Sequence, residues 1–241
     1  MKKNYFLAFF ALLLVSATTV QAQIKIPKVL NNKSSASGNG VSEGEAGQGV
    51  KEALTQGVVN AVLNLNKTDG FFGNQMYKMF LPEDAQKIEK TLRGIGLGGE
   101  VDKAILAINR GAEEAVGFAK PIFIDAIKEI TITDALKLVT GKGNTITEFF
   151  QNKTSSKLIE AFSPSVKTSL DNANATKYYA DIVTTYNKLP TTLKKVNPDL
   201  TSFVVGKTVA ALFDQVAKEE ANIRANPGAQ ASDLLKKVFA K

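Results

Sequence analysis

The apolar residues of this chain recur every three or four positions along most of its length, a spacing that predicts helices. In the segment 50–66, Val50, Leu54, Val58 and Leu65 fall on one helical face. The same period predicts helices over the segments 82–94, 100–130, 133–141, 154–170, 176–189, 199–225 and 232–241. The pattern therefore predicts an all-α fold.

One predicted helix contains a proline. Pro121 lies within the segment 100–130, where it removes a backbone donor and clashes with the preceding turn, so we expect a kink or a break around residues 119–120. Short connections, such as the glycine-rich segment 94–99, separate the other helices. The sequence predicts a compact multi-helix bundle with a kinked central helix.

Two short segments need a separate interpretation. Segment 76–81 alternates weakly between apolar and polar residues, but it is short and stops at Pro82, so we interpret it as an extended connector rather than a strand. Thr145 and Glu148 have the spacing of a capping box, in which side chains of the first turn bond the backbone at a helix start. We therefore expect a helix to be capped at Thr145.

The N-terminus has the pattern of a secretory signal peptide. Lys2 and Lys3 precede an apolar run over residues 6–15, which is too short for a membrane span of roughly 20 residues. We predict cleavage after Ala22, with an uncleaved anchor as the alternative. No later segment approaches transmembrane length, so we expect an exported protein that is soluble in the periplasm or beyond.

The residues that follow differ sharply from the helical segments. Between residues 31 and 49 the only aliphatic residue larger than alanine is Val41, which leaves little surface to bury against the entropy of folding. We therefore predict a signal peptide over 1–22, a flexible leader over 23–49 and a single helical domain over 50–241.

The net positive charge of the protein is small. The net charge of +7 falls to +5 when Lys2 and Lys3 leave with the signal peptide, and acidic and basic residues are intermixed along the helices. Nucleic-acid-binding chains typically carry a basic stripe or tail. We therefore expect no nucleic-acid partner.

The chain contains neither cysteine nor histidine. This absence removes lipid acylation at cysteine, disulfides, histidine-dependent nucleophilic catalysis, ordinary zinc sites and c-type haem attachment. We expect no metal and no cofactor, and we assign no catalytic residue. Carboxylates, lysine, tyrosine or a serine–lysine pair remain available, so the absence weighs against an enzyme without excluding one.

The polar anomaly of the chain lies in the middle of the segment 100–130. Separations of seven, four and seven residues place four polar side chains within roughly 40° on a helical wheel: Asp102, Asn109, Glu113 and Lys120. This stripe is either an outward face with ion pairs or an inward polar seam that pairs with the segment 218–224. The candidate seam or ligand site comprises Asp102, Asn109, Arg110, Glu113, Lys120, Glu220 and Arg224.

Aromatic residues occur as three adjacent pairs: Phe71–Phe72, Phe149–Phe150 and Tyr178–Tyr179. Two neighbours in a helix cannot both face the same core, so we expect one of each pair at a groove or interface. The alternative is that all six are core residues, which is the commoner role of aromatic side chains.

Blocks of residues throughout the chain resemble a bacterial family catalogued as domain of unknown function 4197. The distinctive blocks are Leu81-Pro82-Glu83, Asn109-Arg110 with Glu113, Ala119-Lys120-Pro121-Ile122-Phe123, Glu219-Glu220 with Ile223-Arg224, Asn226-Pro227, and residues 233–239. The resemblance covers nearly all of residues 50–239. It implies an exported, helix-rich protein of Gram-negative bacteria and supplies no activity. The chain departs from the family at Gly111, where alanine is usual, and at Gln230, where we expect arginine.

Three functions are compatible with these observations. The leading hypothesis is a non-enzymatic envelope protein that binds a protein partner or a small apolar or amphipathic ligand in a groove between helices. The second is a hydrolase or lyase acting on envelope material through Glu113 or Glu220 with Arg110, Lys120 or Arg224. The third is a self-associating structural scaffold.

Overall fold

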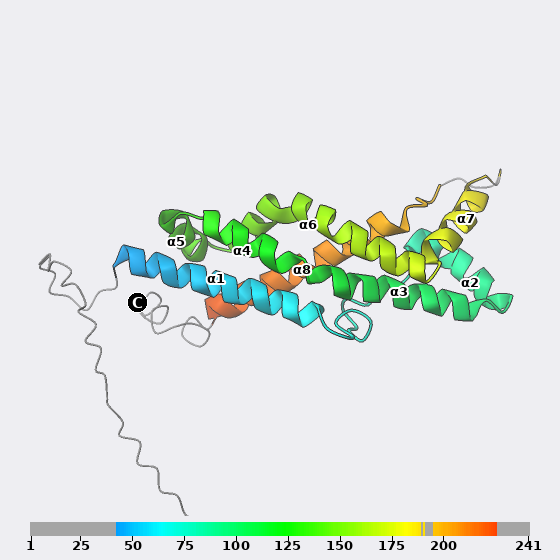
Figure 1. Ribbon diagram of the computed structural model, residues 1–241, viewed down its shortest axis with the longest axis horizontal. Helices are drawn as coiled ribbons and strands as arrows, with labels where there is room; N and C mark the ends of the chain where they lie inside the picture. The colour runs from blue at the N-terminus through cyan, green and yellow to red at the C-terminus, as the bar shows by residue number, and fades with distance from the viewer. Residues whose placement is uncertain (1–41, 189, 191–194, 226–241) are drawn as a thin grey trace, which may run out of the picture. The chain divides into compact units, whose positions relative to one another are not determined.

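The computed structural model describes residues 42–188, 190 and 195–225 (Figure 1). The helices within them are α1 (Glu43–Leu65), the 3-10 helix η1 (Glu83–Ala85), α2 (Gln86–Gly94), α3 (Gly98–Val116), α4 (Ala119–Glu129), α5 (Ile132–Thr140), α6 (Thr145–Asn172), α7 (Ala175–Asn187) and α8 (Leu200–Ala225). No strand occurs in this part of the chain, which confirms the all-α prediction. The predicted signal peptide, residues 23–41 of the predicted leader and the predicted helix 232–241 lie outside the described residues.

Helix α1 begins earlier than expected, so the prediction of a flexible leader is wrong for residues 42–49. Ser42 and Glu45 form a capping box, in which the Glu45 amide donates to Ser42 Oγ (3.3 Å) and the Ser42 amide donates to Glu45 Oε2 (3.0 Å). Gly47 packs so closely on α5 that an added Cβ would lie 2.4 Å from Ile132 Cγ2. Small residues here allow close approach of two helices.

The expected interruption of the central helix is confirmed and takes the form of a break. Helix α3 ends at Val116 and α4 begins at Ala119. Pro121 therefore lies in the first turn of α4, where the amide group that it lacks would have had no partner within the helix. Farther along, the segments expected around Thr145 and over 154–170 are one helix, α6, which continues through Pro164.

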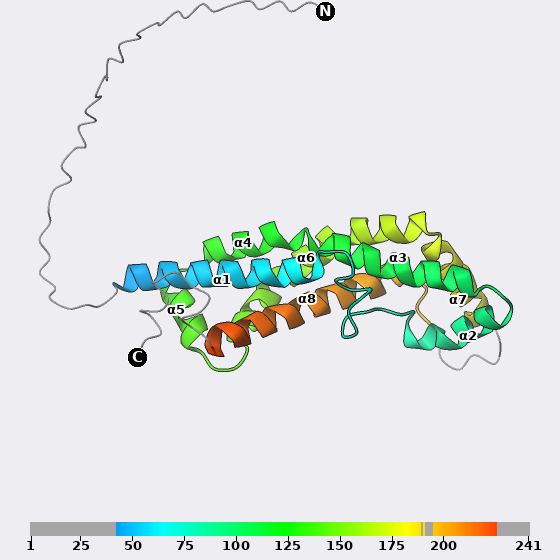
Figure 2. The same ribbon diagram turned by 90° about the horizontal axis from the view of Figure 1, so that it is seen from below.

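The core of the domain lies mainly between α1, α3, α4, α6 and α8. Helix α6 packs against α3, α4 and α8, while α1 packs against α8, α4 and α5. Phe123 lies at the centre, with edge-on ring contacts to Phe150 (5.2 Å between centroids) and Phe213 (6.2 Å). Helices α2 and α7 lie together beside the start of α3, and α5 lies beside the start of α1 (Figures 1 and 2).

The three aromatic pairs divide as expected. Phe71, Phe150 and Tyr179 are buried. Their neighbours Phe72 and Phe149 are partly exposed, and Tyr178 is 51% exposed. One member of each pair is therefore available at the surface.

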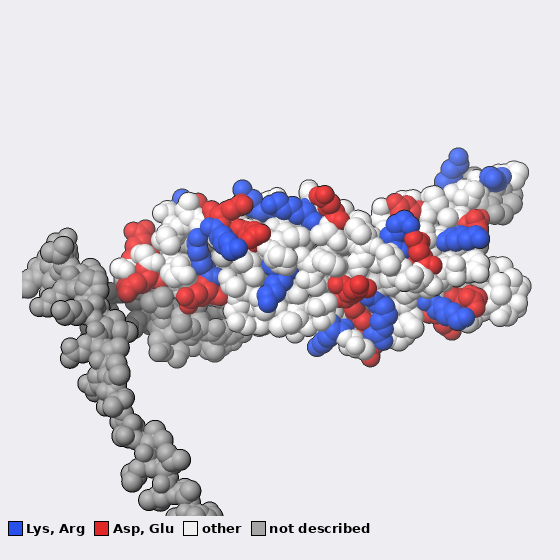
Figure 3. Space-filling view, in the orientation of Figure 1, with Lys and Arg blue, Asp and Glu red and all other residues white. Residues whose placement is uncertain are grey.

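Acidic and basic side chains alternate on the face of the domain shown in Figure 3. Some acidic and basic side chains of the domain form ion pairs one helical turn apart, for example Lys103 with Glu100 (3.0 Å) and Lys128 with Asp125 (2.9 Å). Exposed pairs of this kind contribute little to stability.

By length and composition α8 could cross a membrane, contrary to the expectation that no later segment approaches that length. Half of its most apolar window is buried inside the domain, and the helix packs against α1, α3 and α6. Burial of this extent is typical of a core helix, so its hydropathy is weak evidence for a membrane span.

Candidate functional site

Asn109 holds the connector between α1 and η1 against α3. The residue is fully buried, its Nδ2 donates to the carbonyl of Met79 (2.8 Å), and its Oδ1 accepts from the amide of Met79 (2.8 Å). The Asn109 side chain thus provides partners for both the N–H and the C=O of Met79. In a sheet, a neighbouring strand would provide them. This contact fixes the connector at Met79. The prediction that the whole segment 76–81 is extended is wrong at its start, because residues 75–77 form a turn in which the amides of Tyr77 and Lys78 donate to the carbonyl of Asn74.

Glu113, one turn farther along α3, fixes the beginning of the same connector. Its Oε1 accepts hydrogen bonds from the amides of Phe71 (3.1 Å) and Phe72 (3.0 Å), and its Oε2 pairs with Arg110 (2.6 Å). Arg110 also pairs with Asp69 (2.8 Å). The hydrogen bond to Glu113, more than that to Asp69, raises the pKa of the Arg110 guanidinium above its usual value.

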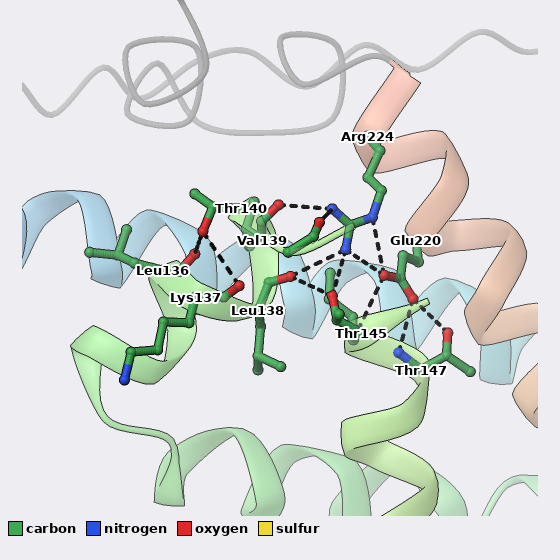
Figure 4. A network of polar contacts seen from close by, with 11 residues as sticks. Leu136, Lys137, Leu138, Val139, Thr140, Thr145, Thr147, Glu220 and Arg224 are labelled. Atoms are coloured by element: carbon green, nitrogen blue, oxygen red, sulfur yellow. Dashed lines mark hydrogen bonds and ion pairs between the residues drawn. The ribbon is translucent and has the colours of Figure 1, made fainter. Parts of the chain in front are cut away.

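Glu220 and Arg224 join three helices (Figure 4). Glu220 accepts from the amides of Ile146 (3.2 Å) and Thr147 (2.9 Å) at the start of α6. Arg224 donates to the carbonyls of Val139 (2.8 Å) and Gly141 (2.7 Å) at the end of α5 and pairs with Glu220 (2.6 Å). A carboxylate at a helix start and a cation at a helix end both complement the helix dipole.

The prediction that Thr145 caps α6 is wrong. Asn144 occupies the cap position without a side-chain hydrogen bond, and Thr145 is the first helical residue. The Thr145 hydroxyl instead donates to the carbonyl of Leu138 (2.8 Å) and accepts from Arg224 (2.8 Å). Glu220 provides the missing cap, and it could do so only because the fold brings α8 alongside.

The predicted seam residues fall into separate groups. Asn109 and Glu113 face inward, whereas Asp102 is exposed and pairs with Arg93 (2.8 Å), and Lys120 is exposed. Among the described residues, no hydrogen bond or ion pair joins the group around Glu113 to the group around Glu220. Glu113 and Glu220, the two carboxylates of the predicted seam that are buried, are each bonded to backbone amides and to an arginine, as expected of groups that connect elements of the fold.

A polar cluster that the sequence analysis missed lies between the connector and α8. The Tyr77 hydroxyl donates to Asp214 Oδ2 (2.5 Å) and accepts from Lys218 Nζ (2.5 Å). Burial and the bond to Asp214 raise the pKa of Tyr77, whereas the bond from Tyr77, followed by that from Lys218, lowers the pKa of Asp214. Tyr77 therefore remains a neutral phenol that bridges the connector to α8.

An apolar cavity of about 170 Å³ lies where η1, α2, α3 and α7 meet. Its lining is almost entirely hydrocarbon and aromatic: Leu81, Ala85, Ile88, Leu92, Leu97, Val101, Ala104, Ala173, Ala175, Tyr178, Tyr179 and Val183, with Glu100 as the one charged residue. Leu97 and Tyr178 are 45% and 51% exposed, so the cavity reaches the surface beside them. None of the seven predicted seam residues lines it.

A wider and more polar groove of about 1070 Å³ adjoins this cavity. It lies between the connector, from Met76 to Gln86, and the first half of α8. Leu81 and Tyr179 line both spaces and form the wall that they share. Tyr179 is held in place by a hydrogen bond from its hydroxyl to the carbonyl of Asn197 (3.2 Å).

A family model described as a protein of unknown function (DUF4197) matches residues 40–240. The chain belongs to this family. The match includes α1 to α8 and every residue of the cavity, the groove and the two buried carboxylate groups. No curated protein and no solved structure matches the chain. The DUF4197 family carries no assigned activity, so its description does not distinguish between the candidate functions.

Proposed function

We propose that this DUF4197 protein binds a small apolar or amphipathic molecule in the cavity between α2, α3 and α7. The observation that carries the proposal is the cavity itself, whose lining is hydrocarbon and aromatic and which opens beside the exposed residues Leu97 and Tyr178. Binding sites for small molecules are typically concave and apolar, with few polar groups.

The cavity volume limits what enters. An engineered protein cavity of about 150 Å³ binds benzene, so about 170 Å³ accommodates one aromatic ring or the end of an alkyl chain. A larger ligand must extend beyond the mouth. This size favours a molecule with a short apolar part over a bulky polycyclic one.

The hydrogen-bond partners of Glu113 and Glu220 favour a binding function over hydrolysis by a carboxylate. A general acid or base must reach the substrate by a hydrogen bond. Glu113 and Glu220 are each bonded to two backbone amides and one arginine, and neither lines the cavity or the adjoining groove. Their geometry supports a structural role.

The first test is native mass spectrometry of the protein purified gently from the periplasm of its own cells. A small molecule that leaves on denaturation supports the proposal and gives the mass of the ligand. The purified, delipidated protein is then titrated with 1-octanol, and thermal stability is followed. Saturable stabilisation is expected, because a ligand that binds only the folded state raises its stability.

A cavity-filling variant tests the location. Ala104→Leu places three further carbon atoms in the cavity wall and should abolish stabilisation by 1-octanol, whereas Ala221→Leu, on an exposed position of α8 outside the lining, should leave it intact. Unchanged binding by Ala104→Leu, or no saturable binding to the parent protein, would refute the proposal.

We also propose that the protein acts outside the cytoplasm, on the basis of the apolar run over residues 6–15 and the cleavage pattern that ends at Ala22. Cell fractionation followed by N-terminal sequencing tests this. Recovery from the periplasm with Gln23 as the first residue is expected, and a cytoplasmic protein that begins at Met1 would contradict it.

A further inference from the structure

The segment 94–99, which joins α2 to α3, presents two aliphatic side chains to solvent at one end of the domain (Figures 1 and 2). Ile95 is 67% exposed and Leu97 is 45% exposed, and the four other residues of the segment are glycines. A Cβ added to three of these glycines would meet no atom within 4 Å. The segment therefore stands clear of the surrounding surface as an uncharged, convex turn.

The end of α2 fixes the conformation of this turn. The amide of Leu97 donates to the carbonyl of Leu92 (2.9 Å), and Gly96, between the two aliphatic residues, has a left-handed φ of 86°. Many helices end with a glycine in this conformation and with hydrogen bonds of this kind. Ile95 and Leu97 are therefore held at the surface by a hydrogen-bonded turn.

We infer that this turn docks the protein on a lipid bilayer, with Ile95 and Leu97 inserted among the lipids. Leu97 and the 51% exposed Tyr178 both line the mouth of the apolar cavity, and tyrosine is typical of residues at a membrane–water interface. Docking in this way directs the mouth of the cavity to the lipid. The docking goes beyond the proposed function and does not depend on it, whereas uptake of the ligand from the bilayer rests on that function.

The size and shape of the exposed surface favour a bilayer over a protein partner. A whole aromatic side chain buries about 150–250 Å², so Ile95, Leu97 and Tyr178, each about half exposed, offer about 300 Å² together. A stable protein interface needs about 800 Å² on each partner, so this surface covers less than half of what a second copy of the chain would need. A fluid bilayer receives a convex turn without a preformed pocket.

The charged residues that flank the turn directly are paired. Arg93 pairs with Glu89 (2.9 Å) and Asp102 (2.8 Å), and Glu100 pairs with Lys103 (3.0 Å). In the view of Figure 3 the surface at the very end of α2 and α3 is uncharged. Paired charges cost less to bring close to lipid than unpaired charges. Docking through the turn therefore does not require an anionic lipid.

The first test is co-sedimentation of the delipidated mature protein with neutral vesicles of dioleoylphosphatidylcholine. Millimolar lipid is needed, because even a whole myristoyl chain binds with only about 10⁴ M⁻¹. Ile95→Asp should weaken vesicle binding about tenfold. Ile159→Asp is the matched control, since Ile159 is an exposed isoleucine of α6, and it should leave binding unchanged. Ile95 does not line the cavity, so Ile95→Asp should still be stabilised by 1-octanol.

Single tryptophan variants locate the contact. The chain contains no tryptophan, so Ile95→Trp and Ile159→Trp each introduce one fluorescent reporter. With vesicles, the fluorescence of Ile95→Trp should shift to the blue and be quenched by brominated lipid, whereas that of Ile159→Trp should do neither. Equal responses of the two variants would overturn the inference.

The remaining outcomes separate the docking from the proposed function. No binding of the parent protein to vesicles would overturn the docking, and so would an Ile95→Asp variant that loses self-association instead of vesicle binding. Stabilisation by 1-octanol in either case leaves the proposed function standing. Vesicle binding that depends on Ile95, without any binding of 1-octanol, would refute the proposed function and leave the docking standing.

Discussion

Replacing Glu220 with alanine should strongly destabilise the fold, because one buried carboxylate serves three helices. It accepts from two amides at the start of α6 and pairs with Arg224, which in turn caps the end of α5. Its loss leaves two buried amides unsatisfied. It also leaves a partly buried guanidinium without its counter-charge.

The size of the effect follows from these contacts. Loss of a side-chain helix cap costs about 0.5–2 kcal/mol, and removal of one partner of a buried ion pair costs about 3–5 kcal/mol. Arg224 is 24% exposed and keeps its carbonyl partners, which lowers the second contribution. We expect a loss of about 3–4 kcal/mol in the free energy of unfolding. At an m-value of about 2 kcal/mol/M, the urea midpoint falls by about 1.5–2 M.

Urea unfolding followed by far-ultraviolet circular dichroism measures this difference. Glu148→Ala is the matched control, since Glu148 is an exposed carboxylate in the first turn of the same helix, and it should cost at most about 1 kcal/mol through the helix dipole. The double variant Glu220→Ala/Arg224→Ala should lose less than the sum of the single variants, because removing both partners leaves no unpaired charge. If the urea midpoint of Glu220→Ala equals that of Glu148→Ala, Glu220 does not stabilise the junction of the three helices.

Four further variants are measured by the same urea titration, the last of them at a series of pH values. Gly47→Ala should cost about 1–3 kcal/mol, because the new Cβ would lie 2.4 Å from an isoleucine of α5. Gly44→Ala has open space and should stabilise by about 0.5–1 kcal/mol, and the same sign for both glycines would contradict this reasoning. Asn109→Ala should cost about 2–4 kcal/mol by leaving two buried backbone groups unsatisfied, and a parent-like midpoint would contradict its role. The pKa of Asp214 is lowered by its bond from Tyr77, so the stability that Asp214 contributes above about pH 4 is lost as the pH falls through its lower folded-state value. Between pH 6 and pH 2 the free energy of unfolding of Asp214→Asn should therefore fall less than that of the parent protein. An unchanged pH dependence would contradict this role of Asp214.

The helices could be predicted because each buries one face, so apolar residues recur at the helical period. The prediction failed where burial does not need large side chains. At the start of α1, Gly47 and Gly49 are buried, and the side chain of Ile132 packs directly on Gly47. A segment of small and polar residues has low hydropathy, so the sequence analysis predicted a flexible leader there. The break at Pro121 could be predicted because proline acts locally, through its own missing amide.

Less of the candidate site could be predicted from the sequence. The helical period identified Asn109 and Glu113 as polar residues on a stripe that could face inward, and both are buried. Their partners lie on the connector over 71–79, about 30 to 40 positions away in the chain, and no local pattern encodes such pairing. The cavity was missed for the opposite reason. Its lining is ordinary apolar sequence, and only the adjacent aromatic pair Tyr178–Tyr179 indicated a surface there.

The cavity has an energetic consequence that connects the fold to its function. The cavity opens at the surface beside Leu97 and Tyr178, so its hydrocarbon lining contacts water, which is unfavourable roughly in proportion to the apolar area exposed. A ligand present at about one hundred times its dissociation constant restores about 2.7 kcal/mol. Ala104→Leu should therefore give a more stable protein that no longer binds. That result would indicate that the proposed site beside α2 is retained at the expense of stability.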